Sequence, residues 1–247
     1  MVKIIYLSVF LTLTITASSC SEKKEEIDKT LTYSIAEEIP VPEPSGLDIS
    51  YDEKGFWVVS DENSKVYLLD SWGNKINSFK VKGEDLEGIT VIDDTTLAVV
   101  LERTNEVVIV NTSGDELKRI ALDLKGEFNS GLEGITYDRN EKKFYVLNEK
   151  KPQLLLVLDE NLAELSRDTL NFAIDVSGIF FDDTDSTLWI LSDESQRIYK
   201  TDLAGNPIKE YKIKVAQPEG IVLNKARTKL YLVSDKTENL YVFELEQ

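Results

Sequence analysis

Acidic residues recur in this sequence at two fixed places of a fivefold repeat. The first place directly precedes a glycine and is Glu in three repeats and Ser in two: Ser45, Glu87, Glu133, Ser177 and Glu219. The second place follows 15 or 16 residues later and is always acidic: Asp61, Glu102, Glu149, Asp193 and Asp235. Carboxylates without histidine or cysteine partners are the ligands of a hard cation. Ca²⁺ takes about six to eight such oxygens in flexible geometry, whereas Mg²⁺ requires a tight octahedron.

The repeat that carries these acids has the length of a β-propeller blade. Its glycines stand at positions 46, 88, 134, 178 and 220, so the spacings are 42, 46, 44 and 42 residues. Each unit contains short apolar runs, rich in β-branched and aromatic residues and bounded by Gly, Asn and Asp, which predict four strands per unit. In the first unit we expect strands over 46–50, 56–60, 65–70 and 75–82. Ile76 and Phe79 are the expected apolar anchors of the fourth strand.

The last unit shows only three strands before Gln247. The segment 31–39 precedes the first Ser-Gly in the way that every fourth strand precedes the next Glu-Gly. We therefore expect it to complete the last blade. The predicted fold is all-β: a five-bladed β-propeller of four-stranded antiparallel blades over 31–247, closed so that its strand edges are protected. Aromatic residues of the second strands, such as Trp57 and Trp189, are expected between blades, whereas Trp72 stands on a turn.

Both acidic positions are expected at one mouth of the central channel. The first strand of a blade lines the channel and the second runs antiparallel beside it, so the start of one and the end of the other lie together. Eight carboxylates would meet there, with Arg103, Lys150 and Lys236 as nearby cations. At an effective dielectric near 20, each close pair of like charges costs about 4 kcal/mol, so protonation, ion pairing or a bound cation must relieve the repulsion.

We predict that this mouth binds calcium. The first-choice ligands are Glu87, Glu133 and Glu219, and the acids expected to join or surround them are Asp61, Asp193 and Asp235. The alternative is a structural belt, in which the glutamates accept hydrogen bonds from backbone N–H groups of neighbouring blades and the glycines only allow close packing. Ser45 and Ser177 are not assigned as ligands.

The first 19 residues have the pattern of a secretion signal. Lys3 precedes the apolar run 4–15, and small residues lead into Cys20, the only cysteine. The run is too short for a membrane span. Small residues before a lone cysteine resemble a bacterial lipoprotein cleavage box, although Ala17 stands where that box usually has Leu. The alternative is an ordinary secretory signal with an incidental cysteine.

We therefore expect a signal peptide over 1–19, lipidation of Cys20, and a polar tether over 20–30 that joins the lipid anchor to the propeller. The Lys and Glu cluster after Cys20 resembles the export signal of surface lipoproteins. The expected location is the bacterial outer membrane, on its periplasmic side or at the surface.

Charge and composition exclude several functions. The net charge is −17, and removal of Lys3 with the signal would make it −18. Such a body repels the phosphates of nucleic acids, so no nucleic-acid partner is expected. The absence of histidine excludes Ser-His-Asp hydrolysis and the usual zinc sites. We expect a monomer, and the sequence names neither a protein partner nor a small-molecule ligand.

The repeated motifs resemble those of a known family. Glu-Gly-Ile recurs at 87–89, 133–135 and 219–221, and Ser-Asp-Glu closes the second strand at 60–62 and 192–194. This pattern resembles the SdiA-regulated, YjiK-like family of bacterial β-propellers over residues 31–247. The resemblance implies a five-bladed propeller, distantly related to NHL-repeat proteins, with a bound calcium ion and no established biochemical activity.

The leading functional hypothesis is a calcium-stabilised, lipid-anchored binding or scaffold module of the cell envelope, with no catalytic residue assigned. The alternative is a calcium-dependent ester or lactone hydrolase similar to the gluconolactonase and regucalcin propellers, in which the ion polarises a carbonyl and a carboxylate acts as base. Those propellers usually have six blades and an Asn ligand, for which Asn148 stands at a comparable place. Glu102 or Glu149 left unligated beside an open coordination position would favour this alternative. A third reading is a structural subunit of a nutrient-uptake complex.

Overall fold

The computed structural model describes residue 1, residues 29–124 and residues 131–245. In these ranges the chain consists of strands and connecting turns. They contain no helix long and apolar enough to cross a membrane. The predicted signal peptide, Cys20 and the tether up to residue 28 lie outside the described residues.

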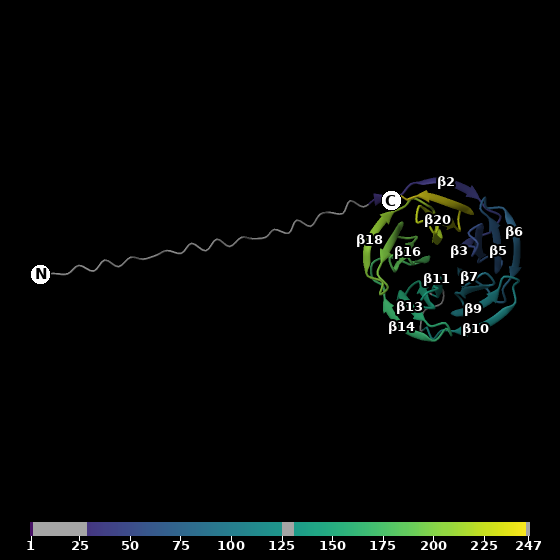
Figure 1. The fold of residues 1–247 in the computed structure, drawn as a ribbon, viewed down its shortest axis with the longest axis horizontal. Coiled ribbons are helices and arrows are strands. Elements are labelled where there is room, and N and C mark those ends of the chain that lie inside the picture. Colours follow the sequence, from purple (N-terminus) through teal and green to yellow (C-terminus); the bar gives the residue numbers. More distant parts are fainter. Residues whose placement is uncertain (2–28, 125–130, 246–247) are drawn as a thin grey trace.

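Five four-stranded antiparallel blades form a ring around a central channel (Figure 1). Blade 1 consists of β3 (Pro44–Ile49), β4 (Gly55–Ser60), β5 (Lys65–Asp70) and β6 (Lys75–Lys80). Blade 2 consists of β7 (Leu86–Val91), β8 (Thr96–Leu101), β9 (Glu106–Asn111) and β10 (Glu116–Ala121). Blade 3 consists of β11 (Leu132–Asp138), β12 (Lys143–Asn148), β13 (Leu154–Leu158) and β14 (Glu164–Thr169). Blade 4 consists of β15 (Ile179–Asp182), β16 (Thr187–Ser192), β17 (Arg197–Thr201) and β18 (Pro207–Lys212). Blade 5 consists of β19 (Pro218–Leu223), β20 (Lys229–Ser234), β21 (Asn239–Glu244) and the N-terminal β2 (Tyr33–Glu38).

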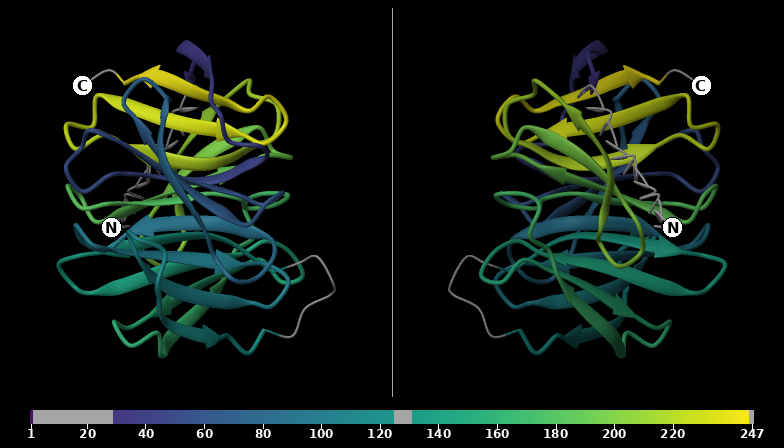
Figure 2. Two further views of the ribbon diagram at one scale, coloured as in Figure 1. Left: turned by 90° about the vertical axis from the view of Figure 1, so that its right-hand side faces the viewer. Right: turned by 90° about the vertical axis from the view of Figure 1, so that its left-hand side faces the viewer.

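The N-terminal strand closes the ring as predicted. β2 pairs antiparallel with β21, from Tyr33 opposite Phe243 to Glu38 opposite Asn239. Figure 2 shows the purple β2 beside the yellow C-terminal strands. This pairing removes the open edge that blade 5 would otherwise present.

One strand was not predicted. β1 (Lys29–Thr30) pairs in parallel with β18 and adds a fifth strand to blade 4. Between β1 and β2, Leu31 is 6% exposed and packs among the residues between blades 4 and 5, including Ile198 and Phe243. The N-terminal segment therefore contacts the rim of two neighbouring blades.

The core lies between the blades. Every residue of β4 and β16 is buried, and the predicted inter-blade aromatic residues Trp57 and Trp189 are each 5% exposed. Such continuous apolar strands form because both faces of an inner strand contact a neighbouring blade.

One expected anchor of the outer strand is wrong. Ile76 is 61% exposed, because the register of β6 shifts between Lys75 and Asn77 and leaves Ile76 as the extra residue of a β-bulge. Phe79 does pack inward, with its ring centroid 6.1 Å from that of Trp57.

Candidate metal centre

All ten residues of the two acidic positions line one cavity at a mouth of the channel, with a volume of about 430 Å³. The first position lies at the start of the channel-lining strands and the second at the end of the strands beside them, as the antiparallel pairing requires. The cavity is also lined by Asp85, Arg103, Lys150, Asp175, Glu194 and Gln217.

A β-bulge places each glutamate at the channel. In blade 2, Leu86 pairs with Leu101 and Gly88 with Val100, so that Glu87 has no partner in the ladder. The register shifts at the same place in blades 1, 3 and 5. A bulged residue is redirected out of the normal alternation of a strand. The bulge thus turns a side chain of the channel-lining strand towards the mouth.

The two serines at this position bind neighbouring blades. Ser45 Oγ donates a hydrogen bond to the carbonyl oxygen of Leu86, and Ser177 Oγ donates to that of Pro218 at 3.1 Å. Each bond links one blade to the next. Serine therefore performs at two places the inter-blade role that the belt hypothesis assigned to the glutamates.

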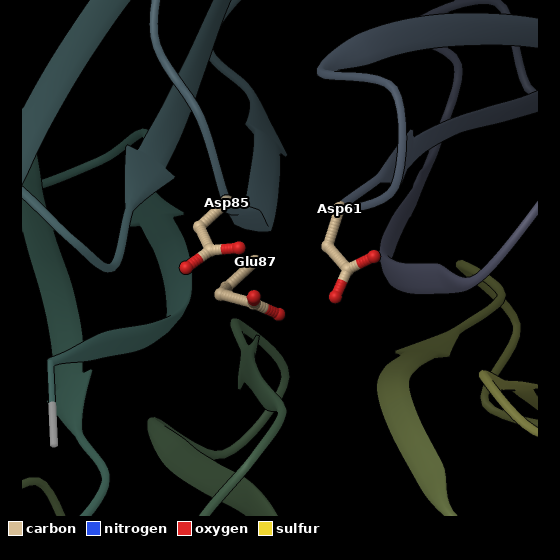
Figure 3. Close-up of side chains that lie close together, drawn as sticks. All are labelled: Asp61, Asp85 and Glu87. Atoms are coloured by element: carbon tan, nitrogen blue, oxygen red, sulfur yellow. The ribbon is translucent and has the colours of Figure 1, made fainter. Parts of the chain in front are cut away.

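Three groups of carboxylates lie close enough to share an ion, with ligand oxygens within 4.8 Å of one another in each group. The first group is Asp61, Asp85 and Glu87, which point towards one another in Figure 3. The second group is Glu102, Glu133 and Glu149. The third group is Glu149, Asp175 and Glu194.

The predicted ligands are distributed unevenly over these groups. Asp61, Glu87 and Glu133 belong to the first two groups. Glu219, Asp193 and Asp235 line the same cavity, but they belong to none of the three groups found among the described residues.

Sequence reasoning missed Asp85, Asp175 and Glu194. A signal was present, because Asp85 and Asp175 each lie two residues before the repeated Glu or Ser, at the place that Glu43 takes in blade 1. Of the residues that lie two positions before the repeated Glu or Ser, Asp85 and Glu43 have positive φ angles of 60° and 42°. Aspartate tolerates this left-handed conformation better than most residues do.

Burial and mutual repulsion favour protonation of the first-position glutamates. The pKa of Glu87, Glu133 and Glu219 is raised well above the usual value, first by burial and then by the charge of neighbouring carboxylates. Burial, a hydrogen bond with Glu43 and nearby acids raise the pKa of Asp61 to about 7.

The second-position acids follow the same trend. Burial is the largest cause that raises the pKa of each of them, namely Glu102, Glu149, Asp193 and Asp235. The cavity therefore holds carboxylates whose charge is not fully compensated by the protein.

Two cationic side chains give partial compensation. Arg103 Nε lies 2.6 Å from Asp85 Oδ2, and Lys150 Nζ lies 2.6 Å from Glu149 and 2.8 Å from Glu194. Eleven carboxylates and these two cations line the cavity. For Lys236, the third expected cation, no ion pair is seen within the described part of the chain.

The residues present fit a hard cation. Asp61 Oδ1 is buried and has no hydrogen-bond partner. Within residues 29–124 and 131–245, no backbone N–H donates to Glu87, Glu133 or Glu219, which disfavours the belt hypothesis. Oxygens up to 4.8 Å apart can share one ion, because calcium–oxygen distances are about 2.4 Å.

Asn148 does not line the cavity. Its Nδ2 donates to the carbonyl oxygens of Lys150 at 3.2 Å and Pro152 at 2.8 Å, so the side chain holds the following loop. Its Oδ1 is buried without a hydrogen-bond partner, but the residue does not belong to the lining from which the carboxylates face the cavity.

These features define a five-bladed β-propeller with a carboxylate-rich channel mouth. The chain belongs to the SdiA-regulated family, whose profile matches residues 21–244. This confirms the family that the sequence motifs indicated.

Several solved structures share the fold at low sequence identity. Glutaminyl cyclase of Myxococcus xanthus matches with a TM-score of 0.71 and 10% identity, covering 88% of this chain and 97% of that one. A luciferin-regenerating enzyme matches with a TM-score of 0.54 and 15% identity, covering 86% and 95%. A chain of a nidogen/laminin complex matches with a TM-score of 0.59 and 16% identity, covering 82% and 76%. At these identities the likeness concerns the fold alone.

Proposed function

We propose that this protein is a calcium-binding propeller module of the bacterial cell envelope. The observation that carries the proposal is the group formed by Asp61, Asp85 and Glu87, in which a buried carboxylate oxygen of Asp61 has no partner. An ion there would replace the missing partner. It would also offset the burial and the carboxylate repulsion that raise the pKa values of Asp61 and Glu87.

The donor set favours calcium over other common metals. All candidate ligands are carboxylates, and the sequence offers neither histidine nor a second cysteine for zinc or copper. An irregular set of carboxylates from several blades suits the flexible coordination of calcium better than the strict magnesium octahedron. Carbonyl oxygens and water would complete the coordination.

The envelope location rests on the N-terminal sequence. Acylation of Cys20 would anchor the protein in the outer membrane, with the polar residues after it as a tether. The propeller then acts as a binding or scaffold body held near the membrane, on its periplasmic or outer side.

Thermal melts test the metal site. The purified protein should melt at higher temperature with millimolar CaCl₂ than with MgCl₂, and EGTA should reverse the gain, because a ligand of the native state stabilises it by mass action. Elemental analysis of dialysed protein should find calcium. Equal melting temperatures in all three conditions, with no ion bound, would overturn the proposal and turn the search to partners.

A calcium-dependent hydrolase is the second candidate. It is favoured by the size of the cavity, because about 430 Å³ leaves room for a small ester or lactone beside an ion. Glu102 is the candidate base, because it lines the cavity without an ion pair among the described residues. A screen of lactones and aryl esters with calcium, compared with Glu102→Gln, would show activity that the variant lacks if this function is correct.

A further inference from the structure

A second cavity of about 400 Å³ lies at the opposite mouth of the channel. It is formed where the channel-lining strands end, around Asp48, Thr90, Thr136, Phe180 and Leu223. Between the two mouths the channel holds only a small cavity of about 10 Å³, which is room for about one water molecule.

The constriction is an aliphatic ring with one residue from each blade: Leu47, Ile89, Ile135, Ile179 and Ile221. All five are at most 6% exposed. The second cavity is therefore blind-ended and separate from the acidic mouth, so an inference about it does not depend on the proposed calcium site.

The chemistry of the second cavity differs from that of the first. Formal charges balance in its lining, with three acids (Asp48, Glu53 and Asp183) and three bases (Arg139, Lys225 and Arg227). Four aromatic residues also line it: Tyr51, Tyr137, Phe180 and Phe181. The whole chain has a net charge of −17, but the lining of this second cavity has no net formal charge. Its surface consists largely of aromatic rings, guanidinium groups and carboxylates.

The arginines of this cavity are held in place. Arg139 crosses from blade 3 to donate to the carbonyl oxygens of Val91 at 2.5 Å and Ile92 at 3.1 Å. It also lies 5.9 Å from the ring centroid of Tyr51. Its guanidinium thus bridges blades 1, 2 and 3.

On the other side, Arg227 of blade 5 pairs with Asp182 at 2.7 Å and Asp183 at 2.5 Å, and stacks 5.2 Å from the ring centroid of Phe180. The ring of Tyr137 is fixed by Phe144, at 4.5 Å between centroids. A preformed lining of this kind loses little entropy when a ligand binds.

We propose that this second cavity binds a neutral carbohydrate, a mono- or disaccharide unit. Flat rings such as Tyr51, which is 56% exposed, present an apolar face to the C–H face of a sugar ring. Asn140 and Asp183 at the cavity wall offer the amide and carboxylate pairs that hydrogen-bond adjacent hydroxyl groups. The volume falls within the usual range for small-ligand pockets, about 300–1,000 Å³.

The charge balance disfavours strongly charged ligands. A phosphorylated ligand would need free cations, but Arg227 is paired with Asp182 and Asp183, and Lys225 lies 3.5 Å from Glu53. The third base, Arg139, donates to the carbonyl oxygens of Val91 and Ile92 and is attracted by the buried Asp48. A metal ion would meet arginine and lysine side chains as near as the carboxylates. A neutral polyol avoids both penalties.

Binding is tested on an array of neutral glycans, followed by calorimetry with cellobiose, lactose, maltose and chitobiose. Wild-type protein should bind at least one neutral glycan, with or without EGTA. Tyr51→Ala should weaken that binding about tenfold, the equivalent of roughly 1.4 kcal/mol, and Tyr51→Phe should retain it. The matched control is Trp72→Ala, which removes an exposed ring, 79% exposed, from a turn at the same end of blade 1 but outside the cavity lining.

Three results would overturn the proposal. They are no binding to any neutral glycan at millimolar concentration, binding only to charged glycans with strong salt dependence, and equal affinity in Tyr51→Ala and wild type. Loss of binding in Trp72→Ala alone would place the site elsewhere on this face and would also refute it. Because glycan binding is also measured in EGTA, its result does not depend on whether the protein binds calcium.

Discussion

Gly88 packs directly against the backbone of Glu133 in the next blade. A Cβ atom on Gly88 would lie 2.7 Å from the carbonyl oxygen of Glu133 and 2.9 Å from the nitrogen of Ile135. The same relation holds between Gly46 and the carbonyl oxygen of Glu87, at 2.5 Å. Glycine is needed at the repeat because the innermost strands meet backbone to backbone, which also brings the glutamates of neighbouring blades together.

Gly88→Ala should destabilise the propeller by about 2 kcal/mol or more, because the clash is with backbone that cannot rotate away. Chemical denaturation followed by circular dichroism measures the change. Ser71→Ala, in an exposed turn, is the control and should change stability little. Equal midpoints for Gly88→Ala and wild type would mean that the blades can separate without cost.

Glu133→Gln should have opposite effects with and without calcium. Without metal it removes a buried carboxyl group whose ionised form is disfavoured by burial and by neighbouring carboxylates. At a pH high enough to ionise that group, the melting temperature should rise by about 2–4 °C for each kcal/mol of repulsion relieved. With calcium it should gain less than wild type does. Glu62→Gln, an exposed acid beside Asp61 but outside the cavity lining, is the matched control. A full calcium response in Glu133→Gln would mean that the second group, Glu102, Glu133 and Glu149, does not hold the ion.

The metal-free protein should become less stable as the pH rises from about 4 to about 7. Asp61 has its pKa raised to about 7 in the folded chain, against about 3.9 in an unfolded one. Between these values the native state binds more protons than the unfolded state, so the free energy of unfolding falls with rising pH. Melts in EGTA should show this slope, and calcium should flatten it. A rise in stability over that interval in EGTA would contradict the assignment.

Removal of residues 1–38 should open the ring. The truncated chain loses β2, its pairing with β21 and the contact of Tyr33 with Tyr241, whose ring centroids lie 4.9 Å apart. We expect a lower melting temperature and aggregation through the exposed edge of β21, measured by scattering and size-exclusion chromatography. Removal of residues 1–28 retains β1 and β2 and should behave like the full chain.

Cys20→Ser should abolish membrane attachment. The cysteine is the predicted acylation site, so fractionation of cells should move the protein from membranes to the soluble fraction, and labelling with radioactive palmitate should disappear. Retention in the membrane fraction without label would mean that another element attaches the protein.

Most of the fold could be predicted from the sequence because its signal is periodic. The strand β5 has the predicted bounds. The other strands of the first unit, and β2, differ from the predicted ranges by only a few residues at their ends. The last repeat has only three strands before the end of the sequence, and this correctly predicted that β2 completes blade 5. The two-residue β1 has no hydrophobic alternation, and its parallel pairing with β18 depends on where β2 places the preceding chain.

The site was predictable in position and less so in composition. The spacing of the repeat alone predicted that Glu87 and Asp61 lie at one mouth of the channel. It did not identify Asp85, which joins them because a left-handed residue directly before the bulge folds its carboxylate back into the cavity. The exposure of Ile76 was missed for a related reason, since a bulge shifts the alternation by one residue. The position of a bulge depends on the register between two paired strands. It could therefore not be predicted from the residue pattern of one strand.

The two short N-terminal strands also decide how the propeller would respond to mechanical force. A pull on the N-terminal segment reaches β1 first, where two residue pairs hold it to blade 4. The longer antiparallel pairing of β2 with β21 closes the ring and lies behind it. β1 should therefore detach first under such a pull, while the pairing of β2 with β21 that closes the ring stays intact. A pull that separates only β1 from β18 should therefore leave the geometry of both channel mouths unchanged.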